Sequence, residues 1–244
     1  MKRITYLLAI MLLFSSCAST YFFSTIDSMN KDTVKDEKGR LVTQNDSLDI
    51  YYSFDGNNGP ILITVYNKGK EPLYIDWKRS SIIIDDIATS YIGKTMPLSG
   101  SANVNTIGSS FYSNISSQSS ASFNGAITKE PESISFIPPN SKIQYKTMNL
   151  ASLNFNKVDD SIYNKRTNVD KDGNIVSVKA ANFTDRDAPL RFRSYLTLYK
   201  DPQKPFSLDQ EFYISSLIKT NRIHPTNMSS FFSESSDLFY TKAK

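Results

Sequence analysis

The sequence predicts an all-β protein of about eight or more antiparallel strands. One observation behind this prediction is the alternation of apolar and polar side chains over residues 48–54, which is typical of a strand with one buried face. The other is the recurrence of short apolar runs between clusters of Gly, Pro, Asn and Asp, which are turn formers. With 244 residues, of which 39% are hydrophobic, the chain can bury a sizeable core. We therefore expect one folded domain over residues 48–244.

The best-specified element is a hairpin that begins at Leu48. Apolar residues occupy every second position of its first strand, and the cluster at residues 55–60 reverses the chain. One register then gives each inward residue an apolar partner, in the pairs Phe54–Ile61, Tyr52–Ile63 and Ile50–Val65. Since a shift of one residue would destroy all of these pairs, the register is strongly specified.

A third strand follows a second turn at residues 68–72. It can extend the meander by facing the preceding strand, in the pairs Leu73–Val65, Ile75–Ile63 and Trp77–Ile61. The opposite face would then carry three tyrosines, Tyr51, Tyr66 and Tyr74. Alternatively, the third strand crosses to the facing sheet of a sandwich, which the same pattern permits.

The middle of the chain contains a serine-rich segment over residues 99–130. Few apolar residues interrupt its Ser, Gly and Asn, so we expect a long flexible loop rather than a core strand. Strands are predicted at residues 133–137 and 142–150, divided by a Pro-Pro pair that cannot donate to a central ladder. Residues 151–170 show weak periodicity and are expected to be irregular.

The C-terminal part begins with Asp-Lys-Asp-Gly-Asn at residues 170–174. This run is similar to part of a calcium-binding loop but has neither the third acidic position nor the terminal glutamate, so we expect a hairpin turn. Strands are predicted at residues 175–178, 189–199 and 212–218. The aromatic residues near the C-terminus predict that residues 223–244 dock on the domain as a tail.

The N-terminus has the layout of a secretory signal. Lys2 and Arg3 precede an apolar run over residues 4–14, which is too short for a permanent membrane span. The run ends in Leu-Phe-Ser-Ser-Cys at residues 13–17, which resembles the lipobox of bacterial lipoproteins, although Phe14 replaces the usual aliphatic residue. That resemblance implies that residues 1–16 are a signal peptide and that the Cys17 thiol receives a diacylglycerol. An ordinary signal peptide with a coincidental cysteine is the alternative.

The residues after Cys17 bear on its destination. Ala18, Ser19 and Thr20 include no acidic residue of the kind that resembles an inner-membrane retention signal, so we expect the outer membrane, facing the periplasm, with the cell surface as the alternative. Because residues 24–47 are mostly polar and charged, residues 17–47 are predicted to be a lipid-anchored tether.

Two segments carry a resemblance to a known group of proteins. They are YNKGKEPLYIDWKRS at residues 66–80 and IPPNS at residues 137–141. In this pairing the chain resembles uncharacterised lipoproteins of the Bacteroidetes type. The resemblance implies an immunoglobulin-like antiparallel β-sandwich in an envelope protein, and it brings no catalytic residues with it.

Four tripeptides are similar to the O-glycosylation acceptor of such bacteria, an Asp followed by Ser or Thr and then an apolar residue. Three of them lie in or beside the predicted tether, where a glycan would be accommodated. The acceptor residues would be Ser28, Thr33, Ser47 and Ser161.

Composition argues against several functions. The formal net charge is +4, of which Lys2 and Arg3 supply two, so the processed chain is nearly neutral and nucleic acid is not an expected partner. The only histidine, His224, and the only cysteine, Cys17, cannot build a His/Cys zinc site, and no Walker loop or dinucleotide fingerprint occurs. No cofactor is implied. Paired carboxylates of the glycosidase kind are formally possible, but the candidates at residues 85–86, 159–160 and 185–187 are in turn-like contexts.

These observations support two functional hypotheses and a distant third. The first is a lipid-anchored, non-enzymatic module that binds or scaffolds other envelope components through a sheet face, an edge strand or the long loop. The second is a carbohydrate-binding lipoprotein of a glycan-uptake system, in which Tyr51, Tyr66 and Tyr74 would stack on sugars. Their alternative role is that of ordinary strand residues, since tyrosine favours strands. The distant third is a glycoside hydrolase.

Overall fold

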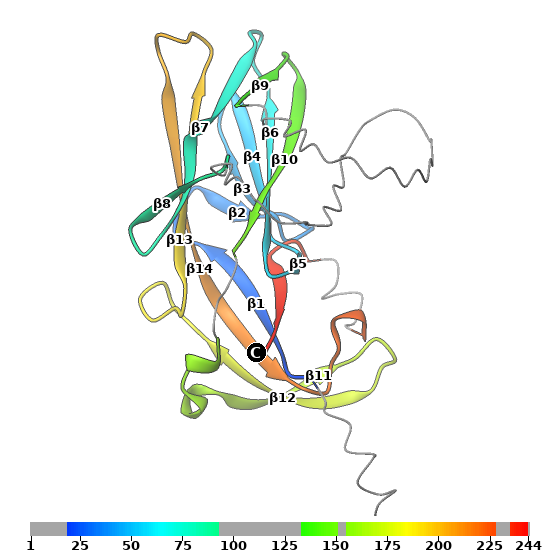
Figure 1. Cartoon of the computed structure of the whole chain (residues 1–244). Coiled ribbons are helices and arrows are strands. Elements are labelled where there is room, and N and C mark those ends of the chain that lie inside the picture. The colour runs from blue at the N-terminus through cyan, green and yellow to red at the C-terminus, as the bar shows by residue number, and fades with distance from the viewer. Residues whose placement is uncertain (1–18, 93–132, 151–154, 228–234, 244) are drawn as a thin grey trace, which may run out of the picture.

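The computed structural model describes residues 19–92, 133–150, 155–227 and 235–243, whose strands form two packed sheets (Figure 1). Sheet A contains β1 (Tyr21–Ser28), β5 (Gly56–Asn57), β7 (Leu73–Ile84), β8 (Ile87–Ser90), β9 (Ile134–Ile137), β11 (Asn164–Val169), β12 (Ile175–Asn182), β13 (Arg191–Tyr199), β14 (Phe206–Thr220) and β15 (Leu238–Lys242). Sheet B contains β2 (Thr33–Lys35), β3 (Leu41–Gln44), β4 (Leu48–Ser53), β6 (Pro60–Asn67) and β10 (Ser141–Asn149). Short 3-10 helices span Phe155–Lys157, Asp160–Ile162 and Pro225–Asn227.

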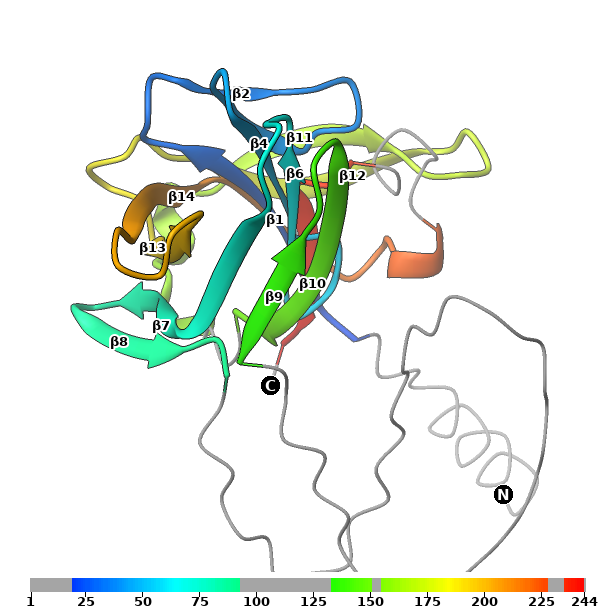
Figure 2. The same cartoon turned by 90° about the horizontal axis from the view of Figure 1, so that it is seen from above.

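The strand order shows how the layers are built. Sheet A runs β5-β15-β1-β14-β13-β7-β8, with β9 also paired to β7 and the β11–β12 hairpin joined to β14. Sheet B runs β10-β6-β4-β3-β2. Viewed from above, β9 of sheet A and β10 of sheet B lie together at one edge (Figure 2). The prediction of an all-β fold is confirmed, while the immunoglobulin-like topology stays a prediction.

The register of the β4–β6 hairpin agrees with the sequence pattern. Ile50 lies opposite Val65, and Tyr52 lies opposite Ile63, as predicted. All four side chains are fully buried. The period of two fixed this register because any shift by one residue would turn the apolar side chains to the outer face.

The third strand does not extend that meander. β7 pairs with β13, β8 and β9 in sheet A, so the predicted pairs of Leu73, Ile75 and Trp77 with β6 are wrong and the crossover alternative is correct. The physical reason is that these three residues share one buried core with the apolar residues of β6, and burial across a core produces the same sequence pattern as pairing beside a neighbour. Trp77 stacks on Tyr145 of sheet B at 4.2 Å between ring centroids.

The predicted tether over residues 17–47 is also wrong from Tyr21 onward. Residues 21–28 form β1, which pairs with β14 on one side and β15 on the other, and residues 33–44 include β2 and β3 of sheet B. Both faces of β1 are covered, because Phe22 and Ile26 lie in the core between the sheets and Phe23 packs in a second cluster with Ile218. Burial of both faces removes the alternation that marks a half-buried strand.

Most of the other strands lie where the sequence predicts them. The strands predicted around residues 133–137, 142–150, 189–199 and 212–218 are present as β9, β10, β13 and β14. Residues 164–169 form β11 rather than irregular chain, and the turn at residues 170–174 closes the β11–β12 hairpin. The C-terminal residues 238–242 dock as β15. The serine-rich segment 99–130 lies outside the described residues.

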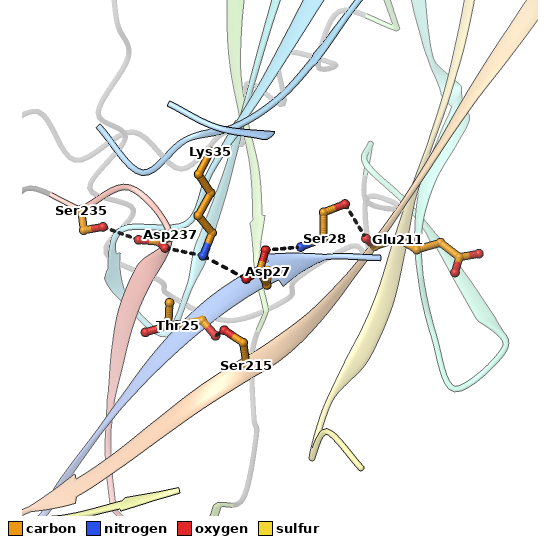
Figure 3. A network of polar contacts seen from close by, with 8 residues as sticks. All are labelled: Thr25, Asp27, Ser28, Lys35, Glu211, Ser215, Ser235 and Asp237. Atoms are coloured by element: carbon orange, nitrogen blue, oxygen red, sulfur yellow. Dashed lines mark hydrogen bonds and ion pairs between the residues drawn. The ribbon is translucent and has the colours of Figure 1, made fainter. Parts of the chain in front are cut away.

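A polar network joins the sheets at β2 (Figure 3). The ammonium of Lys35 lies 2.8 Å from the carboxylate of Asp237 and 3.4 Å from that of Asp27. Asp237, whose side chain is only 8% exposed, also accepts a hydrogen bond from Ser235. Since a buried carboxylate is costly without such partners, the network fixes β2 over the seam between β1 and β15.

Two buried tyrosine hydroxyls meet at Ser194 in the core. The Ser194 hydroxyl oxygen lies 3.0 Å from that of Tyr52 and accepts a hydrogen bond from Tyr91 at 2.6 Å. Burial raises the pKa of both phenols, because the core disfavours the charged phenolate.

This pair predicts a loss of stability at alkaline pH. An unfolded tyrosine releases its proton near pH 10, at about its ordinary pKa, whereas the two buried phenols keep theirs, so the free energy of unfolding falls as pH rises above that value. Tyr91→Phe should cost about 1 kcal/mol at neutral pH through the lost hydrogen bond. Above about pH 10 its stability should fall less steeply than the parent's, by up to about 1.4 kcal/mol per pH unit. Urea unfolding between about pH 8 and 11 measures both slopes, and equal slopes would contradict the assignment.

Candidate functional site

The acidic pairs and the histidine noted in the sequence lie apart from one another in the described residues. Among the described residues, no three His, Cys, Asp or Glu side chains gather as metal ligands would. Asp85 and Asp86 form the β7–β8 turn with positive φ angles of 50° and 61°. The carboxylate of Asp160 pairs with two lysines, and that of Asp187 accepts from the backbone and hydroxyl of Thr184. The sole histidine, His224, is exposed and packs edge-on against Tyr21 at 5.1 Å.

The three tyrosines predicted to share a face do not lie together. Tyr51 of β4 and Tyr66 of β6 are on the outer face of sheet B, whereas Tyr74 of β7 is in sheet A. The predicted face of Tyr51, Tyr66 and Tyr74 is therefore corrected to two separate surfaces. The cause is the crossover of β7, which carries Tyr74 to the outer face of the other sheet.

The first surface is a shallow pocket on sheet B, here called the sheet B pocket. It has a volume of about 390 Å³ and is lined by residues from three strands and two turns, namely Arg40, Tyr51, Thr64, Tyr66, Asn140, Ser141 and Lys142. The register places Tyr51 opposite Thr64, and Tyr66 opposite Lys142, so their side chains share one face.

Charge and aromatic surface meet in the sheet B pocket. The guanidinium of Arg40 lies 4.4 Å from the ring centroid of Tyr51 and is held there by an ion pair to Asp36 at 2.7 Å. Burial and the neighbouring charge of Asp49 raise the pKa of the Tyr51 phenol, whose hydroxyl donates to the Asp49 carboxylate at 3.4 Å. The pocket thus offers ring surface and the cation of Lys142, beside the Arg40–Asp36 ion pair.

The second surface is a row of three rings on sheet A, here called the aromatic row. Tyr74 of β7 lies opposite Phe136 of β9 on one side and Tyr199 of β13 on the other. Its ring stacks on Tyr199 at 5.2 Å with an interplanar angle of 10°, and it packs against Phe136 at 5.4 Å. The neighbouring residues Leu73 and Leu198 are buried in the core, so the row faces outward.

The surroundings of the aromatic row leave it accessible. Phe136 is 54% exposed and Ile134, on the same face of β9, is 46% exposed. Asp76 and Arg79 form an ion pair at 3.7 Å beside the row, with the arginine side chain 69% exposed. In the part of the chain that the structure describes, no strand pairs with the outer edge of β9. Apolar surface, a charged rim and an open strand edge thus coincide.

Sequence reasoning missed the aromatic row. Its rings come from three strands that are distant in the chain, and only the pairing of β7 with both β9 and β13 aligns them. The one available signal was the outward position of Tyr74 and Tyr199 in their strands, which does not reveal that the strands are neighbours.

The predicted modification sites differ in accessibility. The hydroxyl of Ser28 donates to the backbone carbonyl of Glu211 at 3.2 Å, and that of Thr33 lies 2.7 Å from the side-chain oxygen of Gln210. Ser47 and Ser161 are exposed, whereas Ser28 and Thr33 are partly buried. Cys17 lies outside the described residues. Of the four acceptor hydroxyls, those of Ser47 and Ser161 have the access that glycosylation requires.

Comparisons with protein-family models, with curated proteins and with solved structures find no match to this chain. Among the described residues, no helix is both long enough and apolar enough to cross a membrane. The two surfaces are therefore interpreted from their geometry alone.

Proposed function

We propose that this chain is a lipid-anchored protein of the outer membrane, facing the periplasm, that binds another envelope protein through the aromatic row and has no enzymatic activity. The observation that carries the proposal is the alignment of the exposed ring of Phe136 with the half-buried rings of Tyr74 and Tyr199 across three strands. The lipobox-like residues 13–17 support the anchor.

The aromatic row has the composition of a protein-binding surface. Tyr, Phe and Arg are enriched at the centres of protein interfaces. The aromatic rings bury a large area at a small cost in side-chain entropy, because each has only two rotatable side-chain bonds. Tyr74 and Tyr199 are already stacked, so little of their freedom is lost on binding. The edge of β9 that no described strand pairs with offers backbone groups to which an extended partner segment could add as a strand.

The position of the aromatic row suits a membrane-anchored protein. The row lies beside the first residues of β14, since Leu198 is opposite Phe206, whereas the first strand begins at the other end of β14, with Tyr21 opposite Thr220 (Figure 1). The 15 residues of β14 separate these ends by about 45 Å along the strand. A partner at the row would therefore meet the surface farthest from the anchored end.

Site-specific crosslinking tests the aromatic row. A photoreactive residue at Phe136 should give a discrete crosslinked protein in cells, whereas the same residue at Ile87, which is 69% exposed on another edge, should not. Tyr74→Ala should reduce the Phe136 crosslink about tenfold, as expected for a residue at the centre of an interface. The matched control is Tyr66→Ala, which leaves the row intact. Equal crosslinking at Phe136 and Ile87 would refute the proposal.

A second candidate function is the binding of a glycan in the sheet B pocket, as part of a glycan-uptake system. The observation that favours it is the gathering of two tyrosines with Arg40 and Lys142 around one depression. Aromatic surface with a few directed polar groups is typical of small-ligand sites, and the cation of Lys142 favours a sugar that carries a carboxylate.

A glycan array distinguishes this candidate from the first. Binding of an acidic glycan to the parent should weaken about tenfold in Tyr66→Ala and in Lys142→Ala, each of which removes one contact of the sheet B pocket. The control here is Tyr74→Ala, which should bind like the parent. Absence of any glycan binding, or equal loss in the Tyr74 control, would rule out the pocket as a glycan site.

A further inference from the structure

Three lysines lie side by side at the end of sheet A where β1 begins. Lys165 of β11 is directly opposite Lys179 of β12, and Lys179 is directly opposite Lys219 of β14. Residues opposite one another in an antiparallel sheet project from the same face, so the three ammonium groups share one surface, here called the lysine row. Like charges directly opposite one another are destabilising, and a bound anion would relieve that repulsion.

The lysine row continues the inner face of sheet A beyond the core. Phe22, a core residue of β1, is the next residue along the row, opposite Lys219. The Lys219 ammonium lies 5.8 Å from the ring centroids of Phe22 and of Tyr163. In Figure 1, β11 and β12 lie below the strands of sheet B, so the row is reached from the end of the sandwich rather than through the core.

The lysine row is the charged wall of a depression of about 470 Å³. The hydroxyl-bearing Thr20 and Ser177 and the amide-bearing Asn221 also line this depression, and Tyr163 adds ring surface. Ammonium, hydroxyl and amide groups all donate hydrogen bonds to the oxygens of an anion. A volume of this size is typical of sites for small organic molecules rather than for single ions.

The charges on the lysine row do not balance. The carboxylate of Asp160 lies 2.8 Å from the ammonium of Lys219 and 3.3 Å from that of Lys179. Hydrogen bonds from these two lysines hold the pKa of Asp160 below its ordinary value, so it is charged at neutral pH. The ammonium of Lys165 pairs with no residue in the part of the chain that the structure describes. Three ammonium groups against this one carboxylate leave two positive charges.

We propose that the lysine row binds a phosphate monoester, whose phosphate contacts Lys165 and Lys179 and whose esterified group lies in the rest of the depression. A phosphate monoester carries nearly two negative charges at neutral pH, which matches the excess on the row. Lysine binds phosphate as a point charge, without the planar geometry that a guanidinium requires. The site is separate from the aromatic row and the sheet B pocket, and it does not depend on a lipid at Cys17.

Calorimetric titration of the full chain, purified in a neutral detergent, tests the site. The parent should bind sn-glycerol 3-phosphate with a Kd of about 1 mM or tighter, and Lys165→Ala should weaken that binding about tenfold. The matched control is Lys171→Ala, which removes the same charge from the turn of the same hairpin, between Asp170 and Asp172. It should bind like the parent. Equal weakening in both variants would show a response to net charge alone and overturn the site.

A variant that gains affinity gives a readout that damage to the fold cannot imitate. Asp160→Asn removes the carboxylate that competes with the phosphate for Lys179, while its amide oxygen can still accept hydrogen bonds from the lysines. Affinity for sn-glycerol 3-phosphate should therefore rise about tenfold. Unchanged or weaker affinity would overturn the placement of the phosphate on the lysine row.

Two lipids dissolved in the same detergent distinguish a free ester from a headgroup. Phosphatidic acid presents the phosphate monoester on a lipid, whereas phosphatidylglycerol presents a diester with a single charge. Binding of phosphatidic acid at least tenfold tighter than that of sn-glycerol 3-phosphate, and weakened in Lys165→Ala, would assign the site to a lipid headgroup. Similar affinities for these two monoesters would assign it to a free ester. Equal binding of the two lipids, or no binding of either monoester, would overturn the proposal.

Discussion

The central constraint on this molecule is the incorporation of its first strand. β1 is paired along both edges, with β14 and β15, and buried on both faces through Phe22, Phe23 and Ile26. Lys35 adds a link from sheet B through Asp27 and Asp237. Segments from the two ends of the described chain are therefore neighbours in one sheet. A strand held in this way is not a tether, so an anchor at Cys17 would lie only four residues from the folded body.

This constraint gives the two ends of the sandwich different environments. The end at which β1 begins carries the β11–β12 hairpin, with its exposed apolar tip and lysines, and the other end carries the aromatic row and the open edge of β9. The long strand β14 runs between them and fixes their separation. If the end at which β1 begins rests on a membrane, the aromatic row at the other end faces away from that membrane. A flexible tether would not fix this orientation, because the body could then turn either end to the bilayer.

The sequence predicted best those elements that bury one face. The β4–β6 register and β13 followed from the period of two, because one face of each is apolar and one register satisfies it. β1 was missed because both of its faces are buried, and β11 was missed because its residues are mostly exposed, so neither alternates. The partner of β7 was ambiguous because apolar side chains bury equally well across a core and beside a neighbour. The aromatic row was beyond prediction for the same reason, since it exists only through the pairing of β7 with β9 and β13.

The proposed membrane anchor depends most directly on the chemical state of Cys17. Mass spectrometry of the N-terminal peptide, from the protein made in a bacterium that processes lipoproteins, measures that state. The account predicts a peptide that begins at Cys17 and carries the mass of a thioether-linked diacylglycerol, and it predicts that Cys17→Ala no longer fractionates with membranes as the parent does. A mature N-terminus at another residue, or a free thiol on Cys17 with unchanged membrane fractionation of the variant, would contradict it.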